Sequence, residues 1–360
     1  MTLRGALVPY AITRALVALV ALVAVALLPA AALCPDPCHV STNPLLDAAA
    51  RWDGAHYLAI ARDGYVLPAP GAQSDLAFFP LYPFLMRAAG TLLGGGDDAY
   101  LAAGVLISAA ALAVACVYLA RLVALDRDAP TAQRTVVYLL VFPTSVFLAA
   151  VYAESLFLAL GVAAMYEARR ARWPLAAALA ALAALARPFG VLVVVPLAVE
   201  LALQRRGRSG AWLAFPIIAF ATWLGALWRL SGDPLAYLNA QASYGRRPAV
   251  PLGAFTDLAD PAVYGDPWIV IALTLLTAAL VAVGWRVLRP SLAAYATIFF
   301  LASLLTGTLT SAPRYYLAVF PAFIALAIAA PRPVALSYVA LGAAASVVFT
   351  AMFVLRYWVA

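Results

Sequence analysis

Residues 51–65 read RWDGAHYLAIARDGY and residues 77–90 read AFFPLYPFLMRAAG, with a linker rich in proline and glycine between them. This stretch follows a hydrophobic segment, yet it is too polar to cross a bilayer. Charged and aromatic residues gather in it, and one of the chain's two histidines, His56, lies among them. We therefore expect the chemistry of the protein here, at a membrane face.

The composition of the 360-residue chain is that of a polytopic membrane protein. Hydrophobic residues make up 66% of the chain and charged residues 11%, a balance that a soluble core with a wet surface cannot accommodate. All 23 basic residues are arginine, which we attribute to GC-rich coding and hence to a bacterial source. Arginine is also the better bidentate partner for phosphate.

Apolar stretches of roughly 20 residues, or fewer where a helix is broken, predict transmembrane helices. We expect eleven: residues 7–33, 99–120, 134–150, 154–168, 173–186, 188–203, 211–229, 267–285, 291–310, 315–330 and 334–357. The predicted fold class is therefore an all-α polytopic membrane protein, with one domain over residues 1–360. Two long loops interrupt it, at residues 34–98 and 231–266.

The distribution of arginine predicts the orientation, because positively charged loops stay on the cytoplasmic side. With the N-terminus inside, 14 of the 23 arginines lie at inner ends and loops: Arg4, Arg14, Arg121, Arg127, Arg134, Arg169, Arg170, Arg172, Arg205, Arg206, Arg208, Arg286, Arg289 and Arg332. Both long loops are then extracytoplasmic, provided that residues 78–95 lie along the outer face. Pro80, Pro83 and Arg87 favour such a juxtamembrane helix over a spanning one.

Soluble catalytic signatures are absent from the sequence: we find no phosphate-binding glycine loop, nucleophile elbow, zinc helix or dinucleotide fingerprint. We expect a reaction close to lipid, with no metal, cofactor or nucleic acid. Cys34 and Cys38 could form a disulfide or stay as thiols, and only His39 is adjacent for zinc. Cys116 falls inside a predicted helix and suits packing.

Five segments, in this order, resemble the PIG-V family: the two stretches above, FPTSVFLAAVYAESLF at 142–157, ARPFG at 186–190 and SAPRYYLAVFP at 311–321. This family comprises the second mannosyltransferase of GPI-anchor assembly and bacterial relatives, and it belongs to the GT-C class of glycosyltransferases. The resemblance implies a GT-C-like bundle of about 11 transmembrane helices, with juxtamembrane helices in the first long loop. It also implies a polyprenyl-phosphate-linked sugar donor.

The resemblance implies an inverting membrane mannosyltransferase of the bacterial plasma membrane, with its active site on the extracytoplasmic face. Bacteria of this kind make no GPI anchors, so the acceptor stays open among a glycolipid, a glycan and a protein hydroxyl. Mannose against another hexose stays open too. The alternatives are a lipid or glycolipid flippase, whose ionisable residues should line the bilayer midplane, and a non-catalytic scaffold.

An inverting transfer from a lipid phosphate needs a carboxylate that takes the acceptor proton and cations that hold the leaving phosphate. We expect Asp53 to be this base. If residues 51–60 are helical, Asp53, His56 and Tyr57 share one face, and His56 could orient the base or bind phosphate. Asp47 is the substitute base, and the alternative for Asp53 is a helix-capping role.

The predicted cations for the donor phosphate are Arg187 and Arg314, with Arg51 as a third. Arg187 and Arg314 interrupt apolar sequence at the outer ends of predicted helices, where a guanidinium reaches headgroup depth, although snorkelling to lipid headgroups explains them equally well. Glu154, on a short outer turn, could bind a sugar hydroxyl or pair with Arg187, or begin a helix. The remaining residues expected to line the substrate are Trp52, Tyr57, Tyr82 and Tyr315.

Overall fold

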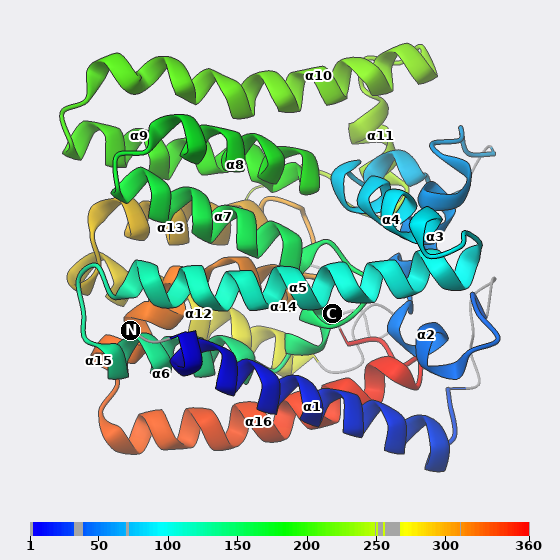
Figure 1. Cartoon of the computed structure of the whole chain (residues 1–360), viewed down its shortest axis with the longest axis horizontal. Helices are drawn as coiled ribbons and strands as arrows, with labels where there is room; N and C mark the ends of the chain where they lie inside the picture. Colours follow the sequence, from blue (N-terminus) through cyan, green and yellow to red (C-terminus); the bar gives the residue numbers. More distant parts are fainter. Residues whose placement is uncertain are drawn as a thin grey trace. The chain divides into compact units, whose positions relative to one another are not determined.

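The computed structural model describes residues 3–31, 39–69, 72–248, 250, 255, 267–309 and 311–359. Every regular element in these ranges is a helix, as the prediction required (Figure 1). Cys34 and Cys38 lie outside the described residues, so their pairing stays open. The chain divides into two compact units, which are described in turn.

The first unit comprises Met1–Gly64, Pro80–Ala159 and Ala330–Val359. Its helices are α1 (Leu3–Leu27), α2 (Pro44–Ala49), α3 (Asp53–Asp63), α4 (Leu81–Leu92), α5 (Asp97–Val123), α6 (Ala129–Leu140), the short 3-10 helix η2 (Ser145–Leu148) and α16 (Arg332–Val354). Helix α1 packs against α5, α6 and α16, and α4 packs against α3 and α5 (Figure 1). These contacts hold the three short helices of residues 44–92 against long apolar ones.

Arg14 lies inside α1, whereas the predicted orientation counted it at an inner helix end. The helix begins four residues earlier than expected, because Leu3 and its neighbours continue the helical run. The Arg14 guanidinium donates hydrogen bonds to the carbonyl oxygens of Ser145 at 3.0 Å and Leu140 at 3.3 Å. The Arg14 guanidinium thereby supplies hydrogen-bond donors to carbonyl oxygens at and just after the end of α6.

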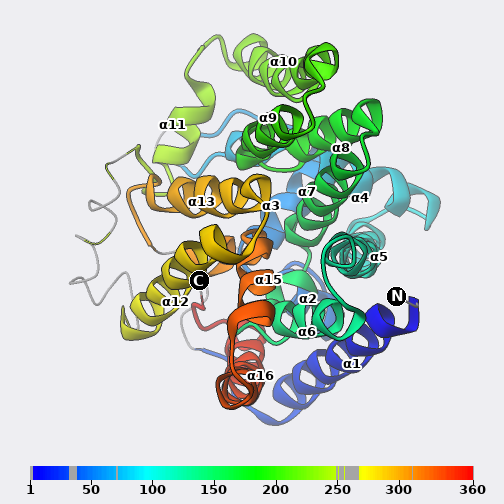
Figure 2. The same ribbon diagram turned by 90° about the vertical axis from the view of Figure 1, so that its left-hand side faces the viewer.

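The second unit comprises Tyr65–Phe79 and Leu160–Ala329, together with Ala360. Its elements are η1 (Asp75–Ala77), most of α7 (Glu154–Arg169), α8 (Trp173–Ala186), η3 (Pro188–Val193), α9 (Val194–Leu203), η4 (Gly207–Leu213), α10 (Ala214–Ser231), α11 (Ala236–Ala242), α12 (Pro267–Val287), α13 (Pro290–Leu304), α14 (Ala312–Tyr315), η6 (Tyr316–Ala318) and α15 (Phe320–Ala329). Helix α8 packs on α10 and η3, and α9 packs on α13. Figure 2 shows α12 beside α13 and α15, which it also contacts.

Five helices of the described residues are long and apolar enough to cross a membrane, and a bent pair raises the number to six. They are Arg4–Leu27, Asp97–Val123, Gly207–Ser231, Pro267–Val287 and Arg332–Val354, with the pair Ala312–Ala318 and Phe320–Ala329. A multi-pass membrane protein is therefore supported, whereas eleven complete spans are not confirmed. Several of the predicted spans are shorter apolar helices, such as Trp173–Ala186 and Pro290–Leu304.

Proline explains why two predicted spans are not single straight helices. The predicted span 134–150 stops as a helix at Leu140, just before Pro143, which lacks a backbone N–H and disfavours helix in the residue before it. The predicted span 315–330 is bent by 73° between its two helical parts, near Pro321. Residues 188–193, predicted as helix after Pro188, form the 3-10 helix η3.

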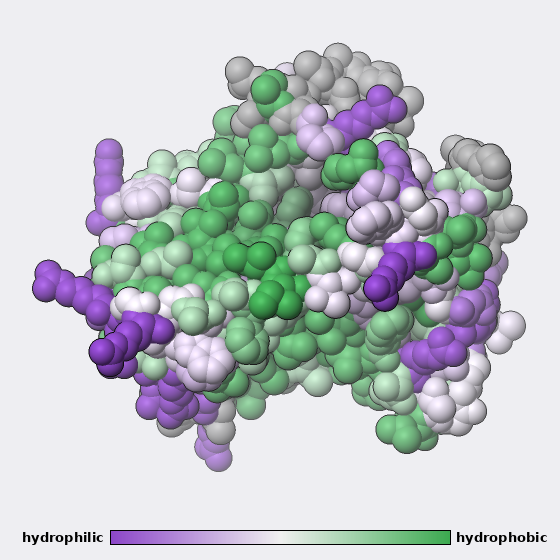
Figure 3. Space-filling view, turned by 90° about the horizontal axis from the view of Figure 1, so that it is seen from above, coloured by the Kyte–Doolittle hydropathy of each residue, from purple (hydrophilic) through white to green (hydrophobic). Residues whose placement is uncertain are grey.

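Large apolar side chains cover outward faces of the long helices. On α1, Ile12 is 63% exposed, and on α16 Leu341 is 71% exposed. Helix α10 exposes Phe215, Ile217 and Ile218. Figure 3 shows a broad field of hydrophobic side chains with hydrophilic ones gathered toward its two ends. Such contiguous apolar surface is expected where a helix faces lipid.

Candidate functional site

Asp47 is the centre of a buried charge cluster in the first unit. Asn43 caps α2 by accepting hydrogen bonds from the N–H groups of Leu45 and Leu46, which fixes the helix that carries Asp47. The Asp47 carboxylate, 3% exposed as a residue, accepts hydrogen bonds from the guanidinium groups of Arg51 and Arg356. These contacts join α2 to the chain after α16.

Further donors complete the surroundings of the Asp47 carboxylate. The N–H of Val40 donates to Oδ1 at 2.9 Å, and His39 Nδ1 lies 2.9 Å from Oδ2. Burial acts to raise the pKa of Asp47, but the hydrogen bonds from Val40 and Arg51 outweigh it, so the pKa lies below its ordinary value. A carboxylate with its lone pairs engaged and its pKa lowered is a poor general base.

Arg51, predicted as a third phosphate ligand, uses its guanidinium within this cluster. Besides Asp47, it donates through Nε to the carbonyl oxygen of Val354 at 3.2 Å. Its side chain is only 11% exposed. The structure therefore gives Arg51 contacts that hold α2 to the end of α16, and its phosphate role stays a prediction.

Asp53 is the first residue of α3. The hydroxyl of Tyr152 is bonded to the backbone on both sides of Trp52, the residue that precedes Asp53. The Asp53 N–H donates to the Tyr152 hydroxyl oxygen at 3.1 Å, while that hydroxyl donates to the Arg51 carbonyl oxygen at 2.8 Å. Trp52, between them, has a φ of 57° and its ring packs edge-on against Trp358 at a centroid distance of 5.0 Å. This clamp fixes where α3 begins and hence where Asp53 stands.

The condition that the first motif be helical is met from Asp53 onward, since α3 runs from Asp53 to Asp63. Asp53, His56 and Tyr57 thus have the spacing of one helix face. Tyr57 is buried and packs edge-on against Tyr82 at 5.0 Å. Tyr82 is fully buried, with its hydroxyl bonded to Gly104 O and Ser108 Oγ, both at 2.9 Å. That position is one of packing, and a substrate contact for Tyr82 stays a prediction.

Glu154 is a buried acid at the start of α7, 4% exposed. It follows Tyr152 by two residues, so the VYAESLF segment supplies both the clamp on α3 and this carboxylate. A first-turn acid interacts favourably with the helix dipole, which is the alternative considered from the sequence. Its predicted contact with a sugar hydroxyl is not tested by these contacts.

Three arginines of the second unit surround one tyrosine ring. The guanidinium carbons of Arg187, Arg314 and Arg246 lie 5.1, 5.4 and 5.9 Å from the centroid of the Tyr315 ring. We call these three residues the Tyr315 arginine cluster. Arg314 is 3% exposed, although it carries a guanidinium. Three guanidinium groups close to one ring offer hydrogen-bond donors of the kind that suits a phosphate.

Local backbone features bring the members of this cluster to the ring. Arg187 ends α8 in an extended conformation, and Gly190 lets η3 fold back against that end. A Cβ on Gly190 would lie 2.0 Å from the Ala183 carbonyl oxygen, so no other residue fits there without a shift. Phe189 packs edge-on against Tyr315 at 5.5 Å. The ARPFG segment therefore presents Arg187 toward Tyr315.

Arg246 was missed as a site residue, because the sequence shows it only as one charge in a polar loop. Its guanidinium donates to Ser311 Oγ at 3.1 Å and to Gln241 Oε1 at 3.4 Å. Tyr237 lies close by, where burial raises the pKa of its hydroxyl and Arg246 and Arg187 oppose that rise. The 231–266 loop thus contributes to the cluster.

A metal site is not visible in the part of the chain that the structure describes, where no three His, Cys, Asp or Glu side chains come together. Cys116 is a buried free thiol.

Comparison with known families agrees with these features. The family model for mannosyltransferase (PIG-V) matches residues 5–205, which is more than half of the chain. The chain belongs to the PIG-V mannosyltransferase family. No curated protein matches it. The PIG-V match includes Asp53, Glu154 and Arg187, whereas Arg246 and Arg314 lie beyond it, so that their assignment rests on the geometry around Tyr315.

The contacts of Tyr152 and Arg356 in this PIG-V family member were also not predicted from the sequence. Tyr152 lies within a segment that carried the resemblance to the family. A tyrosine hydroxyl two residues before Glu154 was the one local indication that this residue makes a polar contact. Arg356 lies 309 residues from Asp47 in the sequence, and nothing local to it indicates that contact.

Proposed function

We propose that this protein is a GT-C-like membrane glycosyltransferase that moves mannose from a polyprenyl-phosphate-linked donor to an acceptor hydroxyl with inversion. The acceptor oxygen attacks the anomeric carbon, the bond from that carbon to the phosphate oxygen breaks, and the electron pair leaves with the polyprenyl phosphate. Membership of the PIG-V mannosyltransferase family supports the sugar and the reaction type. The Tyr315 arginine cluster is the observation that carries the donor assignment.

Asp53 is proposed as the base that takes the acceptor proton. The state of Asp47 supports this choice, because four donors already approach that carboxylate and its pKa is lowered. Asp53 stands at the start of α3, whose backbone Tyr152 fixes, so its position is defined before substrate arrives. His56, one turn later, is proposed to orient the base, and Glu154 to bind a sugar hydroxyl.

Arg187, Arg314 and Arg246 are proposed to hold the leaving phosphate. Negative charge grows on that phosphate as the sugar departs, so cations fixed in place stabilise the transition state more than the ground state. Burial of Arg314 supports the role, since a guanidinium shielded from water interacts more strongly with an anion. Trp52, Tyr57 and Tyr315 are proposed to line the substrate.

The bacterial plasma membrane is the proposed location, with the reaction on the extracytoplasmic face and a glycolipid, glycan or protein as acceptor. The arginine distribution supports this orientation. A lipid flippase, the alternative from the sequence, is not favoured by membership of a mannosyltransferase family.

The test is transfer of radiolabelled mannose from polyprenyl-phosphate mannose to a membrane extract of the source organism. Purified wild type is compared with Asp53→Asn and with Asp63→Asn, an exposed acid at the other end of α3 that serves as the matched control. Wild type and Asp63→Asn should transfer label, whereas Asp53→Asn should fold and bind donor yet lose about 1000-fold or more in turnover.

Two outcomes would contradict the proposal. Wild-type turnover by Asp53→Asn would remove Asp53 as the base and leave Asp47 as the carboxylate to test. Absence of transfer by wild type, with several polyprenyl-phosphate donors and acceptor extracts, would argue against the transferase assignment.

A further inference from the structure

The linker between α3 and α4 belongs to the second unit, although both helices belong to the first. The structure describes this α3–α4 linker over residues 65–69 and 72–79. It ends in Ala77, Phe78 and Phe79, the start of the AFFPLYP segment that carried the family resemblance. All three residues are buried, with at most 8% exposed. The end of the linker is therefore packed against the second unit and is not a solvated loop.

Aromatic and polar contacts hold the linker on helices α10 and α11. The Phe79 ring stacks on Phe220 of α10 at a centroid distance of 5.8 Å and packs edge-on against Tyr237 of α11 at 5.5 Å. The N–H of Ser74 donates to the Oγ of Ser243, just after α11, at 3.2 Å. Both geometries are favourable for aromatic pairs. These contacts fix the position of the linker beside α11.

Two residues that contact the linker also contact Arg246. Gln241 donates through Nε2 to the Ala77 carbonyl oxygen at 3.1 Å, and its Oε1 accepts from Arg246 Nη1 at 3.4 Å. The Tyr244 ring packs edge-on against Phe78 at 5.8 Å, and the Arg246 guanidinium carbon lies 5.9 Å from the centroid of that ring. Because the Gln241 amide nitrogen must face a carbonyl acceptor, the amide oxygen faces Arg246. The linker thus supports Arg246 through both an amide and an aromatic ring.

The backbone turn after α11 brings Arg246 back to Gln241. The Arg246 N–H donates to the Gln241 carbonyl oxygen at 3.1 Å, and the Gly245 N–H donates to that of Ala242 at 3.0 Å, which is the pattern of a Schellman motif. Gly245 has a φ of 72°, as that motif requires. The turn fixes the backbone of Arg246, so the contacts of its side chain decide where the guanidinium points.

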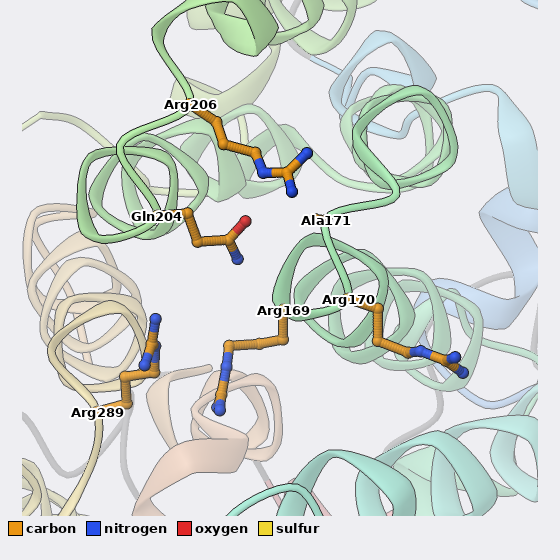
Figure 4. Close-up of a pocket in the computed structure, with 6 residues that line it drawn as sticks. All are labelled: Arg169, Arg170, Ala171, Gln204, Arg206 and Arg289. Carbon is orange, nitrogen blue, oxygen red and sulfur yellow. The ribbon is translucent and has the colours of Figure 1, made fainter.

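Neutral acceptors orient the Arg246 guanidinium. Its hydrogen bonds among the described residues go to the amide oxygen of Gln241 and the hydroxyl of Ser311. Arg289, which lines the arginine-rich recess of Figure 4, is instead bonded twice to the Glu200 carboxylate, at 2.8 and 2.9 Å. A carboxylate pairs the charge of the guanidinium that it holds. A neutral acceptor directs the guanidinium without pairing its charge, which suits a cation that is to meet a phosphate.

We propose that the α3–α4 linker positions Arg246 for the donor phosphate, and that Gln241 is the positioning residue through which it acts. This inference rests on the proposed role of Arg246 in holding the leaving phosphate. Gln241 acts through Arg246 and not by a phosphate contact of its own. With the amide held by the Ala77 carbonyl oxygen, the guanidinium is oriented before donor arrives, so less ordering is left for the binding step.

A double-mutant cycle in the full-length protein tests this inference. The probe is farnesyl phosphate, a short-chain polyprenyl phosphate, titrated by calorimetry against protein in neutral detergent. The cycle comprises wild type, Gln241→Met, Arg246→Gln and the double variant, since two residues that act as one should lose affinity non-additively. The control is Asn239→Met, which removes an exposed amide of the same helix that donates to Asp233 at 2.7 Å.

Gln241→Met should weaken farnesyl phosphate binding about fivefold when Arg246 is present and less than about twofold when Arg246 is already replaced. Asn239→Met should bind as wild type does. Equal factors in both backgrounds, or no loss for Gln241→Met, would overturn the inference while leaving Arg246 as a phosphate ligand.

Two other results would remove the proposed donor role of Arg246 and this inference with it: wild-type affinity of Arg246→Gln, or no binding of farnesyl phosphate by wild type. If Gln241→Met does not fold, Gln241→Asn takes its place in the cycle. Its amide is one methylene shorter and cannot reach both Ala77 and Arg246, so the same outcomes decide.

Discussion

Replacing Gly190 by alanine should destabilise the second unit and displace Arg187. The added Cβ would lie 2.0 Å from Ala183 O, 2.3 Å from Ala183 C and 2.5 Å from Ala184 N. All three atoms are backbone at the end of α8, where no side-chain rotation relieves the overlap. Overpacking of a rigid site costs about 3 kcal/mol in free energy of unfolding. The shift needed to relieve it moves η3 away from α8, and with it Arg187.

The matched control is Gly225→Ala, within α10 of the same unit. A Cβ at Gly225 meets nothing within 4 Å, and alanine is the better helix former, so this variant should gain about 0.5–1 kcal/mol. Unfolding in detergent by urea gives both free energies, and donor titration should show a raised KM for Gly190→Ala alone. Wild-type stability and KM for Gly190→Ala would refute the role given to the ARPFG turn.

Three further changes test other contacts. Arg246→Gln should raise the donor KM about tenfold, whereas Arg247→Gln, an exposed neighbour, should not. Asp47→Asn should lose about 3 kcal/mol in free energy of unfolding near neutral pH, because it takes the carboxylate charge away from the buried guanidinium groups of Arg51 and Arg356. The difference in unfolding free energy between Asp47→Asn and wild type should narrow as the pH falls below 3.8, the ordinary pKa of an aspartate. The lowered pKa of Asp47 stabilises the folded wild type above that pH, and this contribution is lost once the carboxylate is protonated in the folded state. Arg14→Leu removes the donor from two backbone carbonyls and should lower the free energy of unfolding by about 2 kcal/mol; urea titration measures it and unchanged stability contradicts it.

Features encoded locally were predictable from the sequence. Helix α8 has the bounds expected from its apolar run, Trp173–Ala186, because the proline after Arg187 ends it. A juxtamembrane helix was expected in the first long loop, and the shared face of Asp53, His56 and Tyr57 depended on residues 51–60 being helical, a condition that α3 meets from Asp53 onward; the helix ends at Gly64, whose φ of 82° glycine adopts readily. Each of these rests on a signal within a few residues.

Two interruptions within apolar runs were not predicted, because the spans were placed by hydropathy, which does not distinguish a spanning helix from one that a proline breaks. Residues 134–150 contain enough apolar residues for a span, yet one proline stops the α-helix. Residues 315–330 are apolar throughout and still bend by 73°. The count of eleven spans followed from hydropathy alone, so it treated both segments as continuous.

Some residues of the candidate site were predicted from the sequence and others were not. Arg187 and Arg314 stood out because each interrupts apolar sequence, where an unpaired charge is unfavourable. Arg246 lies in a polar loop next to Arg247, and the sequence does not distinguish an arginine that makes a specific contact there from one that faces solvent. Tyr152 and Asp53 are 99 residues apart, and their contact depends on how α3 packs against the segment after η2 within the first unit. Long-range contacts of this kind leave no periodic trace in a single sequence.

Backbone strain at Trp52 links the fold of the first unit to its proposed chemistry. A tryptophan at φ 57° is unfavourable by about 1–2 kcal/mol, because its Cβ approaches the following carbonyl. The Tyr152 hydroxyl offsets this by bonding to the carbonyl before Trp52 and to the N–H after it, and the ring contact with Trp358 adds to the offset. The backbone conformation of Trp52 turns the chain sharply between the Asp47 cluster and α3. Asp53 thus begins a helix of its own, while Asp47 in α2 keeps its hydrogen bonds to Arg51 and Arg356. The turn at Trp52 therefore places two nearby carboxylates in different surroundings, which is how one can serve as a base while the other stays ionised and structural.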